Sequence, residues 1–494
     1  MIVVRPDGRG AKKLRLMMKH PITLLAALLF ATRVALHAAG DEPQAKPSVE
    51  AVPPFQSGER WCALGDSITH AGSYHRDIEM FYLTRFPSLK LDVINCGISG
   101  DTAVGAEKRL PWDCLNAKPT VVTVMLGMND VKRDLYAAGA TGPEIEKKRT
   151  AAAETYDTTM RQVLEALKNS GANVVCILPT PFDDTADLPS ANNPGCDAAL
   201  QGLGQRVRAM AREFGFPIID FHGPLAAINV EKQKTDPHFT IIGPDRVHPK
   251  EPGHLIMAAE FLKAQHLEGP VSRIDINVAA KRPGTLENCE VSDLSVSPET
   301  VSFTCDEHAL PFPVPEGAKP ALELIPFMKD FDQETLRVTG MAPGDYELKI
   351  DGQVIRRYSA AELEEGVNLA AEISTPQYQQ ALAVLAALGK KWEAAGKIRT
   401  IAYVEFSSWP DAPRPVDPVL LQPKMEAQLA SVKGKSYEPY IRDQQKKYAE
   451  LKAHEAEFPV QVQAAVAAAR QAAVPKPHRF TLTRVAPTSS RSSP

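Results

Sequence analysis

Short runs of apolar residues alternate with longer amphipathic stretches between residue 60 and about residue 268. The runs read WCALG, LDVINCG, TVVTVMLG, NVVCILP and PIIDF. Such continuous apolar character is typical of strands that are buried on both faces of a parallel sheet. Because helical patterns separate the runs, strand and helix alternate along this half of the chain. We therefore predict an α/β fold with a doubly wound, parallel, five-stranded sheet.

The amphipathic stretches between the runs carry apolar residues at helical spacing. In two of them these residues share one helical face. They are Tyr74, Ile78, Phe81 and Tyr82 in the first, and Leu200, Leu203, Val207, Met210 and Phe214 in the second. Gly215 is placed to end the second helix as its C-cap. A last helix is predicted from GHLIMAAEFLKAQHLE.

The pattern changes after about residue 275. YELKIDGQVIRRY alternates polar and apolar residues around Asp351-Gly352, which predicts a β-hairpin. Ser359 and Glu362 have the spacing of a capping box, and Thr375-Pro376 opens a helix. Further helices are predicted near 417–432, 438–456 and 460–474, and HRFTLTRV is a candidate returning strand. The C-terminal half is therefore predicted to be an accessory β-plus-helical region.

The N-terminus has the pattern of a signal peptide. Lys12, Lys13, Arg15 and Lys19 precede the apolar run PITLLAALLFAT, and small residues follow in ALHAAG. A membrane anchor is the competing interpretation, but about twelve apolar residues are too few to span a bilayer, which needs roughly 20. We expect a secreted or periplasmic protein with no stable membrane anchor.

These patterns divide the chain into six predicted parts. They are a signal peptide (1–40), a linker (41–58), an α/β domain (59–274), a small β-rich region (275–360), a mainly helical region (361–485) and a disordered tail (486–494). A chain of 494 residues is long enough for two or three domains.

Charge and cysteine content narrow the function classes. The 56 basic and 60 acidic residues give a net charge of −4 without a long block of one sign, so no nucleic-acid partner is expected. Cys62, Cys96 and Cys176 lie inside apolar runs and are predicted core thiols. Cys289 and Cys305 are candidates for a disulfide in an oxidising compartment. None of the cysteine spacings matches a zinc site, and no metal is expected.

Polar residues suited to catalysis follow the predicted strands. Ligands of a doubly wound sheet bind beyond the C-terminal ends of its strands. Gly65-Asp66-Ser67 follows the first strand, GISGDT the second and GMND the third, and DRVHP precedes the last helix. A hydroxyl, two glycine turns, a carboxamide, a carboxylate and an imidazole are thus predicted to meet at one edge.

These blocks resemble the SGNH hydrolases, also called the GDSL esterase family. The matching residues are Ser67 in GDS, Gly100 in GISGDT, Asn129 in GMND, and Asp245 with His248 in the D-x-x-H pattern. Each block is common alone, but together they occur in the family order. The resemblance implies a serine esterase in the α/β domain that needs no metal or organic cofactor.

The residues support the same chemistry independently. A serine hydroxyl needs a base and a third group that orients the base, which are the roles expected of His248 and Asp245 for Ser67. The backbone N–H groups of Ser67 and Gly100 and the side-chain amide of Asn129 are the expected oxyanion hole. The structural alternative is that Asp245 caps a turn, His248 is a loop residue and Asn129 is a turn residue.

Several functional alternatives stay open. The preferred substrate is a small-molecule or polysaccharide ester, with removal of short acyl (acetyl) groups from carbohydrate. A lysophospholipase or thioesterase is the enzymatic alternative, and a catalytically inactive carbohydrate- or partner-binding protein is the alternative from another class. Trp392, Tyr403, Phe406 and Trp409 are candidates for sugar stacking, although such aromatics more often belong to the core. The remaining histidines in the α/β half are expected at surface, turn or pocket-rim positions; they are His70, His75, His222, His238 and His254.

Overall fold

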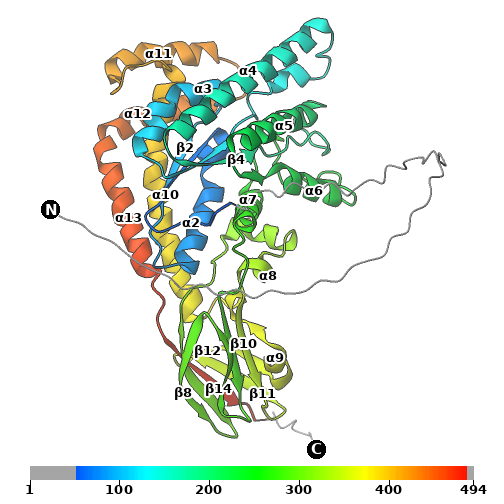
Figure 1. The fold of residues 1–494 in the computed structure, drawn as a ribbon, viewed down its shortest axis with the longest axis vertical. Helices are drawn as coiled ribbons and strands as arrows, with labels where there is room; N and C mark the ends of the chain where they lie inside the picture. The colour runs from blue at the N-terminus through cyan, green and yellow to red at the C-terminus, as the bar shows by residue number, and fades with distance from the viewer. Residues whose placement is uncertain (1–51, 487–494) are drawn as a thin grey trace, which may run out of the picture. The chain divides into compact units, whose positions relative to one another are not determined.

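A five-stranded parallel sheet organises the N-terminal half of the protein (Figure 1). The computed structural model describes residues 52–486, so the predicted signal peptide, most of the predicted linker and nearly all of the predicted tail lie outside the described residues. The sheet has the order β2-β1-β3-β4-β5. Its strands are β1 (Arg60–Gly65), β2 (Asp92–Gly97), β3 (Val121–Met125), β4 (Asn173–Leu178) and β5 (Ile218–Asp220). The predicted fold class is confirmed.

Helices cover both faces of this sheet, because alternate residues of each strand point to opposite sides. Trp61 and Ala63 of β1 belong to one core with α2 and α7, whereas Cys62 and Leu64 belong to a second core with α4 and α5. The helices are α1 (Ser67–Ala71), α2 (Ser73–Arg85), α3 (Ala103–Arg109), α4 (Pro143–Asn169), α5 (Cys196–Phe214), α6 (His222–Lys232) and α7 (Glu251–Ala264). Gly215 ends α5 in the left-handed conformation, as predicted.

Two smaller sheets follow in the C-terminal half. One has the order β13-β10-β6-β7 and the other β12-β11-β14-β9-β8. Their strands are β6 (Ser272–Asn277), β7 (Arg282–Glu287), β8 (Cys289–Val296), β9 (Thr300–Glu307), β10 (Glu334–Thr339), β11 (Asp345–Ile350), β12 (Gln353–Ser359), β13 (Val367–Asn368) and β14 (His478–Arg484), with α8 (Phe327–Phe331) and α9 (Ala360–Glu365) between them. The hairpin turn at Asp351-Gly352 has positive φ at both residues, and the Ser359–Glu362 capping box is formed.

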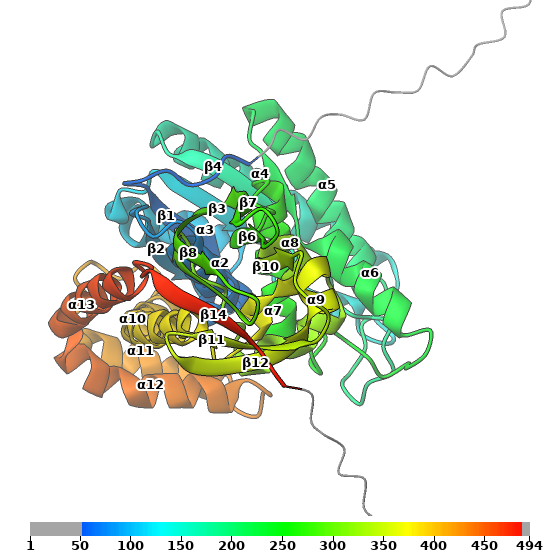
Figure 2. The same ribbon diagram turned by 90° about the horizontal axis from the view of Figure 1, so that it is seen from below.

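Of the predicted C-terminal helices, the first packs on α2 and β2, and the others pack on the first (Figures 1 and 2). They are α10 (Pro376–Ser408), α11 (Pro418–Ser431), α12 (Glu438–Ala453) and α13 (Phe458–Ala472). The chain then returns as β14, which pairs between β9 and β11. The accessory β-plus-helical region is confirmed. In the sequence, helices α10–α13 separate β14 from the other strands of the same sheet.

A buried ion pair joins α10 to the α/β half. Lys391 Nζ lies 2.9 Å from Glu79 Oε2 of α2 and also donates to the Val93 carbonyl of β2 at 2.7 Å. Their side chains are only 3% and 5% exposed. Since each charge would be costly to bury alone, the pair requires α10 to stay seated on α2.

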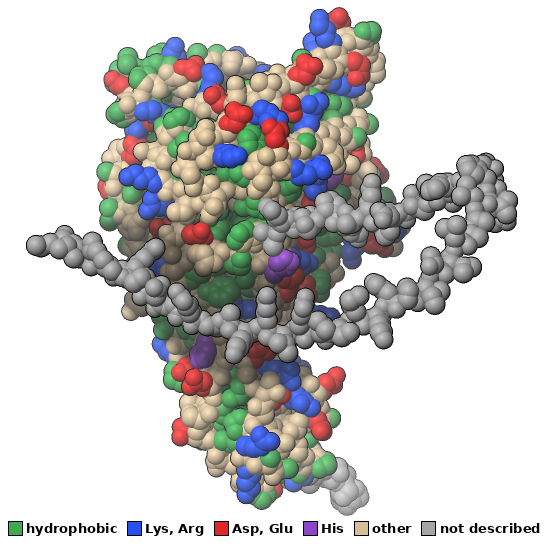
Figure 3. Space-filling model, in the orientation of Figure 1, with side chains coloured by type: hydrophobic (Ala, Val, Ile, Leu, Met, Phe, Trp, Pro, Cys, Tyr) green, Lys and Arg blue, Asp and Glu red, His purple; other side chains and the backbone are tan. Residues whose placement is uncertain are grey.

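The structure bears on the expectations for surface charge, for membrane spans and for the histidines of the α/β half. On the face drawn in Figure 3, basic and acidic side chains are interspersed. Among the described residues, no helix combines the length and apolar character that a membrane span requires. The expectation of exposed histidines is wrong for His75 and His254, which are 0% and 3% exposed. His75 is covered by Trp392 of α10, and His254 is stacked on Tyr74.

The predicted core thiols and the candidate disulfide have different outcomes. Cys62, Cys96 and Cys176 are fully buried, as predicted. Cys289 and Cys305 are free thiols on the neighbouring strands β8 and β9, and Cys289 Sγ donates to the Arg273 carbonyl at 3.2 Å. Tyr403 and Phe406 are buried in a core cluster that Trp409 packs against, and Trp392 packs against another core cluster, so these four aromatics are packing residues.

We predict that Lys391→Met will lower the free energy of unfolding by about 3–5 kcal/mol, because Glu79 is then buried without a counter-charge. Lys397→Met is the matched control, because Lys397 lies on the same helix and pairs with the exposed Glu393. Little change in the free energy of unfolding is expected for this variant. Urea unfolding of both variants checks this. Equal losses in the two variants would show that the Lys391 pair is not what couples the helices to α2.

Candidate active site

Ser67 stands at the first position of α1, directly after β1. Asp66 caps this helix, since its side chain accepts a hydrogen bond from Ile68 N–H at 3.0 Å. The N–H of a first helical residue has no carbonyl partner within the helix. Ser67 therefore presents both its hydroxyl and a backbone N–H that no carbonyl of its own helix accepts.

Ser67, His248 and Asp245 are connected by hydrogen bonds. Ser67 Oγ lies 2.7 Å from His248 Nε2, and His248 Nδ1 lies 2.6 Å from Asp245 Oδ2. Partial burial alone would raise the pKa of Asp245, but hydrogen bonds from the ring and backbone of His248 outweigh it and lower the pKa to about 2. Asp245 is thus a carboxylate at neutral pH, suited to hold Nδ1 as the protonated nitrogen.

The loop that carries Asp245 and His248 is anchored by the arginine between them. Arg246 is 2% exposed and has a positive φ of 65°. Its guanidinium donates to the carbonyls of Asp183, Ala186, Leu188 and Ser190. Asp245 Oδ1 also accepts the backbone N–H groups of Val247 and His248. These bonds fix the direction in which the imidazole points.

Gly100 lies in a tight turn after β2. Asp101 N–H donates to the Ile98 carbonyl at 3.2 Å, and Gly100 has φ +79°. A glycine with positive φ at the third position of a four-residue turn is the mark of a type II turn, which glycine adopts without strain. Gly100 is exposed, so its N–H belongs to a turn that faces solvent.

Asn129 is held in one orientation by two partners. Its Nδ2 donates to the Asp101 carbonyl at 2.9 Å, and its Oδ1 accepts from Arg133 Nη1 at 3.1 Å. One of its two amide N–H bonds is therefore used, and the other remains for a further acceptor. The bond to Asp101 also ties the loop after β3 to the loop after β2.

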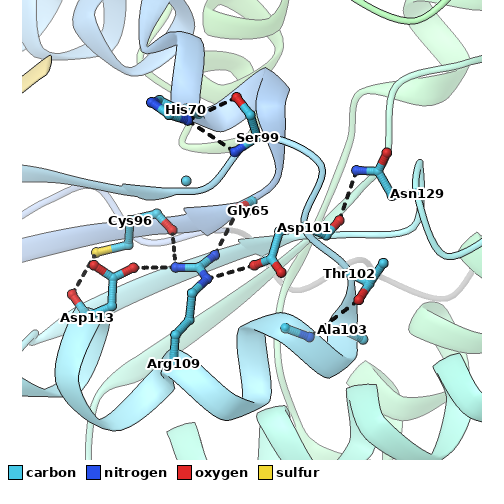
Figure 4. Close-up of polar contacts among 12 residues, drawn as sticks. Gly65, His70, Cys96, Ser99, Asp101, Thr102, Ala103, Arg109, Asp113 and Asn129 are labelled. Carbon is cyan, nitrogen blue, oxygen red and sulfur yellow. Dashed lines mark hydrogen bonds and ion pairs between the residues drawn. The ribbon is translucent and has the colours of Figure 1, made fainter. Parts of the chain in front are cut away.

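Arg109 is the buried centre of these loops (Figure 4). Its side chain is 0% exposed, and it donates to the carbonyl of Gly65 at 3.0 Å and that of Cys96 at 2.8 Å. It also pairs with Asp101 at 2.7 Å and with Asp113. One guanidinium thus binds the ends of β1 and β2 and the last residue of the Gly100 turn.

Three cysteines near Arg109 are the group of side chains in residues 52–486 that could hold a metal ion. The sulfur atoms of Cys62, Cys96 and Cys114 all lie within 4.8 Å of one another, and all three residues are buried. Cys96 Sγ already donates to the Asp113 carbonyl at 3.5 Å. The trio lies within the apolar core under the sheet, and the Ser67–His248–Asp245 chemistry does not involve it.

Comparison with known proteins identifies the family. Residues 63–256 match the GDSL-like Lipase/Acylhydrolase family. The solved structure of a gut microbial diltiazem-metabolizing enzyme is 31% identical, with a TM-score of 0.78, and the match covers 88% of this chain and 100% of that one. The chain belongs to the GDSL-like lipase/acylhydrolase family. It is accordingly an ester-hydrolysing enzyme.

A curated relative of this esterase is a carbohydrate esterase. The acetylxylan esterase of Geobacillus stearothermophilus is 27% identical over 232 residues, which are 44% of this chain and 98% of that protein. The structure brings Ser67, His248 and Asp245 into hydrogen-bond contact and places Gly100 and Asn129 on the neighbouring loops, which Asp101 links.

Sequence reasoning missed the arginines that support this site in the esterase. Arg246 had a sequence signal, because it lies between Asp245 and His248 in the D-x-x-H block, where its conformation affects the direction of both side chains. Arg133 follows Asn129 by four residues, but a surface role explained it equally well. Arg109 had none, because the strand-end carbonyls that it binds besides Asp101 and Asp113 lie 13 and 44 residues away in sequence.

We predict that Asp66→Asn will make the stability of the esterase less dependent on pH. Burial raises the pKa of Asp66 from 3.8 to about 6. The native state therefore binds this proton more tightly than the unfolded state, and the contribution of Asp66 to stability falls as pH rises between those values. Wild type should lose about 1 kcal/mol more than the variant between pH 5 and pH 7.

Urea unfolding at both pH values measures this difference, since asparagine keeps the N-cap. Asp411→Asn, which changes an exposed carboxylate, is the control and should parallel wild type. A variant with the full wild-type pH dependence would contradict the raised pKa.

Proposed function

We propose that this esterase cleaves carboxylic esters with Ser67 as nucleophile, His248 as general base and Asp245 as the residue that orients His248. The observation that carries the proposal is the continuous hydrogen-bonded path from Ser67 Oγ through the imidazole to Asp245 Oδ2. This path is what an unactivated hydroxyl requires in order to attack at neutral pH. It also argues against a purely binding protein, which has no use for it.

The reaction follows from these contacts. Ser67 Oγ attacks the ester carbonyl carbon while its proton passes to His248 Nε2, and Asp245 stabilises the resulting imidazolium. Collapse of the tetrahedral intermediate breaks the C–O bond of the ester, and His248 returns the proton to the leaving alcohol. Water then repeats the sequence on the acyl-serine and releases the acid.

The oxyanion of the intermediate is assigned to three donors. They are the backbone N–H groups of Ser67 and Gly100 and the Nδ2 hydrogen of Asn129 that Asp101 does not use. Because these groups are held by α1, by a hydrogen-bonded turn and by Arg133, they need little reorganisation when charge develops. Such a donor typically contributes about 3–4 kcal/mol of transition-state stabilisation.

The preferred substrate is a short-chain ester of a carbohydrate. The similarity to an acetylxylan esterase supports this class. The loop between β4 and α5, with the sequence PFDDTADLPSANNPG, is also polar and rich in turns, and it binds Arg246 of the loop that carries Asp245 and His248. Polar walls suit a hydroxyl-bearing leaving group, whereas a lysophospholipid needs an apolar groove. Export, inferred from the first 40 residues, would place the enzyme where such polymers occur.

We expect Ser67→Ala to lose about 10⁴-fold or more of its activity on p-nitrophenyl acetate, because Ser67 Oγ is the hydroxyl within residues 52–486 that hydrogen-bonds to His248 Nε2. Labelling by a fluorophosphonate should be lost in parallel. Ser170→Ala is the matched control: this residue follows α4, at the opposite edge of the sheet from the strand ends that carry the site, and should retain full activity. An active, unlabelled Ser67→Ala protein would falsify the nucleophile assignment.

The acyl and alcohol preferences can be separated by substrate. We expect kcat/KM to fall as the acyl chain of p-nitrophenyl esters lengthens from acetyl to octanoyl, because a polar pocket offers a long chain no apolar surface. An acetylated xylo-oligosaccharide should be a better substrate than lysophosphatidylcholine. The reverse order in both series would favour the lysophospholipase alternative, and a thioester preference would favour a thioesterase.

A further inference from the structure

The turn that carries Gly100 is held by side chains on both sides. Ser99, which precedes Gly100, donates its N–H to His70 Nδ1 at 3.0 Å, and its Oγ lies 3.0 Å from the same nitrogen (Figure 4). Burial lowers the pKa of His70 to about 3, so the ring is neutral and Nδ1 can accept. His70 belongs to α1, so this contact links the turn to the helix that Ser67 begins.

The second partner of Ser99 comes from the C-terminal helices. Tyr440 Oη of α12 lies 3.0 Å from Ser99 Oγ. The ring of Tyr440 packs on that of Tyr403 of α10, with 5.5 Å between the ring centroids. The Tyr403 ring packs in turn on the His70 ring, with 5.8 Å between the centroids. Tyr403 is 5% exposed, whereas Tyr440 is 40% exposed. A contact between residues 341 positions apart thus reaches the turn at the solvent-facing rim of the site.

A third contact supports the turn from below. Arg399 of α10 donates from Nη2 to the Gly97 carbonyl at 3.0 Å and pairs with Asp113, which also binds Arg109. Its side chain is 7% exposed. Gly97 itself packs directly on α1, where a Cβ would lie 2.2 Å from His70 N. The strand end, the turn and α1 are therefore restrained together by two C-terminal helices.

We propose that Tyr440 is a positioning residue of the oxyanion hole, acting through Ser99 to hold the Ile98–Asp101 turn with Gly100 N–H directed at the substrate carbonyl. This inference rests on the proposed function. A four-residue turn can flip its central peptide, which carries the Gly100 N–H, with little change elsewhere. The Ser99 side chain opposes such a flip because its Oγ is bound to His70 Nδ1. The Tyr440 hydroxyl, which comes from outside the α/β domain, restrains the same Oγ atom.

The test is Tyr440→Phe, which removes one oxygen atom and keeps the ring packed on Tyr403. We expect kcat on p-nitrophenyl acetate to fall about three- to tenfold, as loss of one hydrogen bond allows, with KM nearly unchanged. The inhibition constant of a small alkylboronic acid, whose serine adduct places an oxygen in the oxyanion hole, should rise by the same factor. A merely structural role would not move that constant.

Two further variants define the route and the control. Ser99→Ala should produce a similar loss, and the double variant should lose no more than either single one, because both act on one contact. Tyr448→Phe is the matched control, since Tyr448 is on the same helix and its hydroxyl donates to Glu405 at 3.0 Å. It should lower the melting temperature and leave kcat and boronate inhibition unchanged.

The outcomes separate this inference from the proposed function. Full kcat in Tyr440→Phe, with Ser67→Ala inactive, would overturn the positioning role and leave the nucleophile intact. An active Ser67→Ala would instead reject the proposed function itself. A loss seen only with an acetylated saccharide would show that Tyr440 contacts the sugar, and additive losses in the double variant or an equal loss in Tyr448→Phe would also overturn the inference.

Discussion

A single buried guanidinium holds the site together. Arg109 has no exposed surface, so it must satisfy its donors within the protein, and it does so with carbonyls at the ends of β1 and β2 and with two aspartates. Removing those acceptors would leave an unpaired charge in the core, which is far more costly than any surface rearrangement. The loops after β1 and β2 are consequently not independent. Arg109 thus fixes the relative positions of Ser67 and Gly100 through hydrogen bonds to the residues around them.

The fold could be read from the chain because its signals are local. Apolar runs such as TVVTVMLG mark buried strands, Gly215 marks a helix end, and Asp351-Gly352 marks a hairpin; each depends only on neighbouring residues. Ser67, Asp245 and His248 were also accessible, since each follows or precedes a predicted element at the same sheet edge. Their hydrogen-bonded geometry agrees with that placement, while their catalytic roles and the domain boundaries stay predictions.

What could not be predicted are the contacts that depend on long-range packing. Nothing around Tyr440 or Arg399 distinguishes them from other residues of amphipathic helices until α10 and α12 are placed against β2. The burial of His75 has the same origin, because Trp392 of α10 closes over it. The helical region is for this reason better described as a wall of the esterase than as a module attached to it. The buried ion pair of Lys391 and Glu79 adds an electrostatic interaction to the packing between α10 and α2.

The position of β14 constrains the order in which the protein can be completed. β9 and β11 are both made before the helices, yet they have no direct pairing with each other, because β14 lies between them. Until residues 478–484 leave the ribosome, each of the two strands presents an open edge that another chain can pair with. More than a hundred residues, which include helices α10–α13, must be synthesised during that interval. Among the described strands, β14 is thus the one that joins the two halves of this sheet, and the sheet is complete only when residues 478–484 have been added.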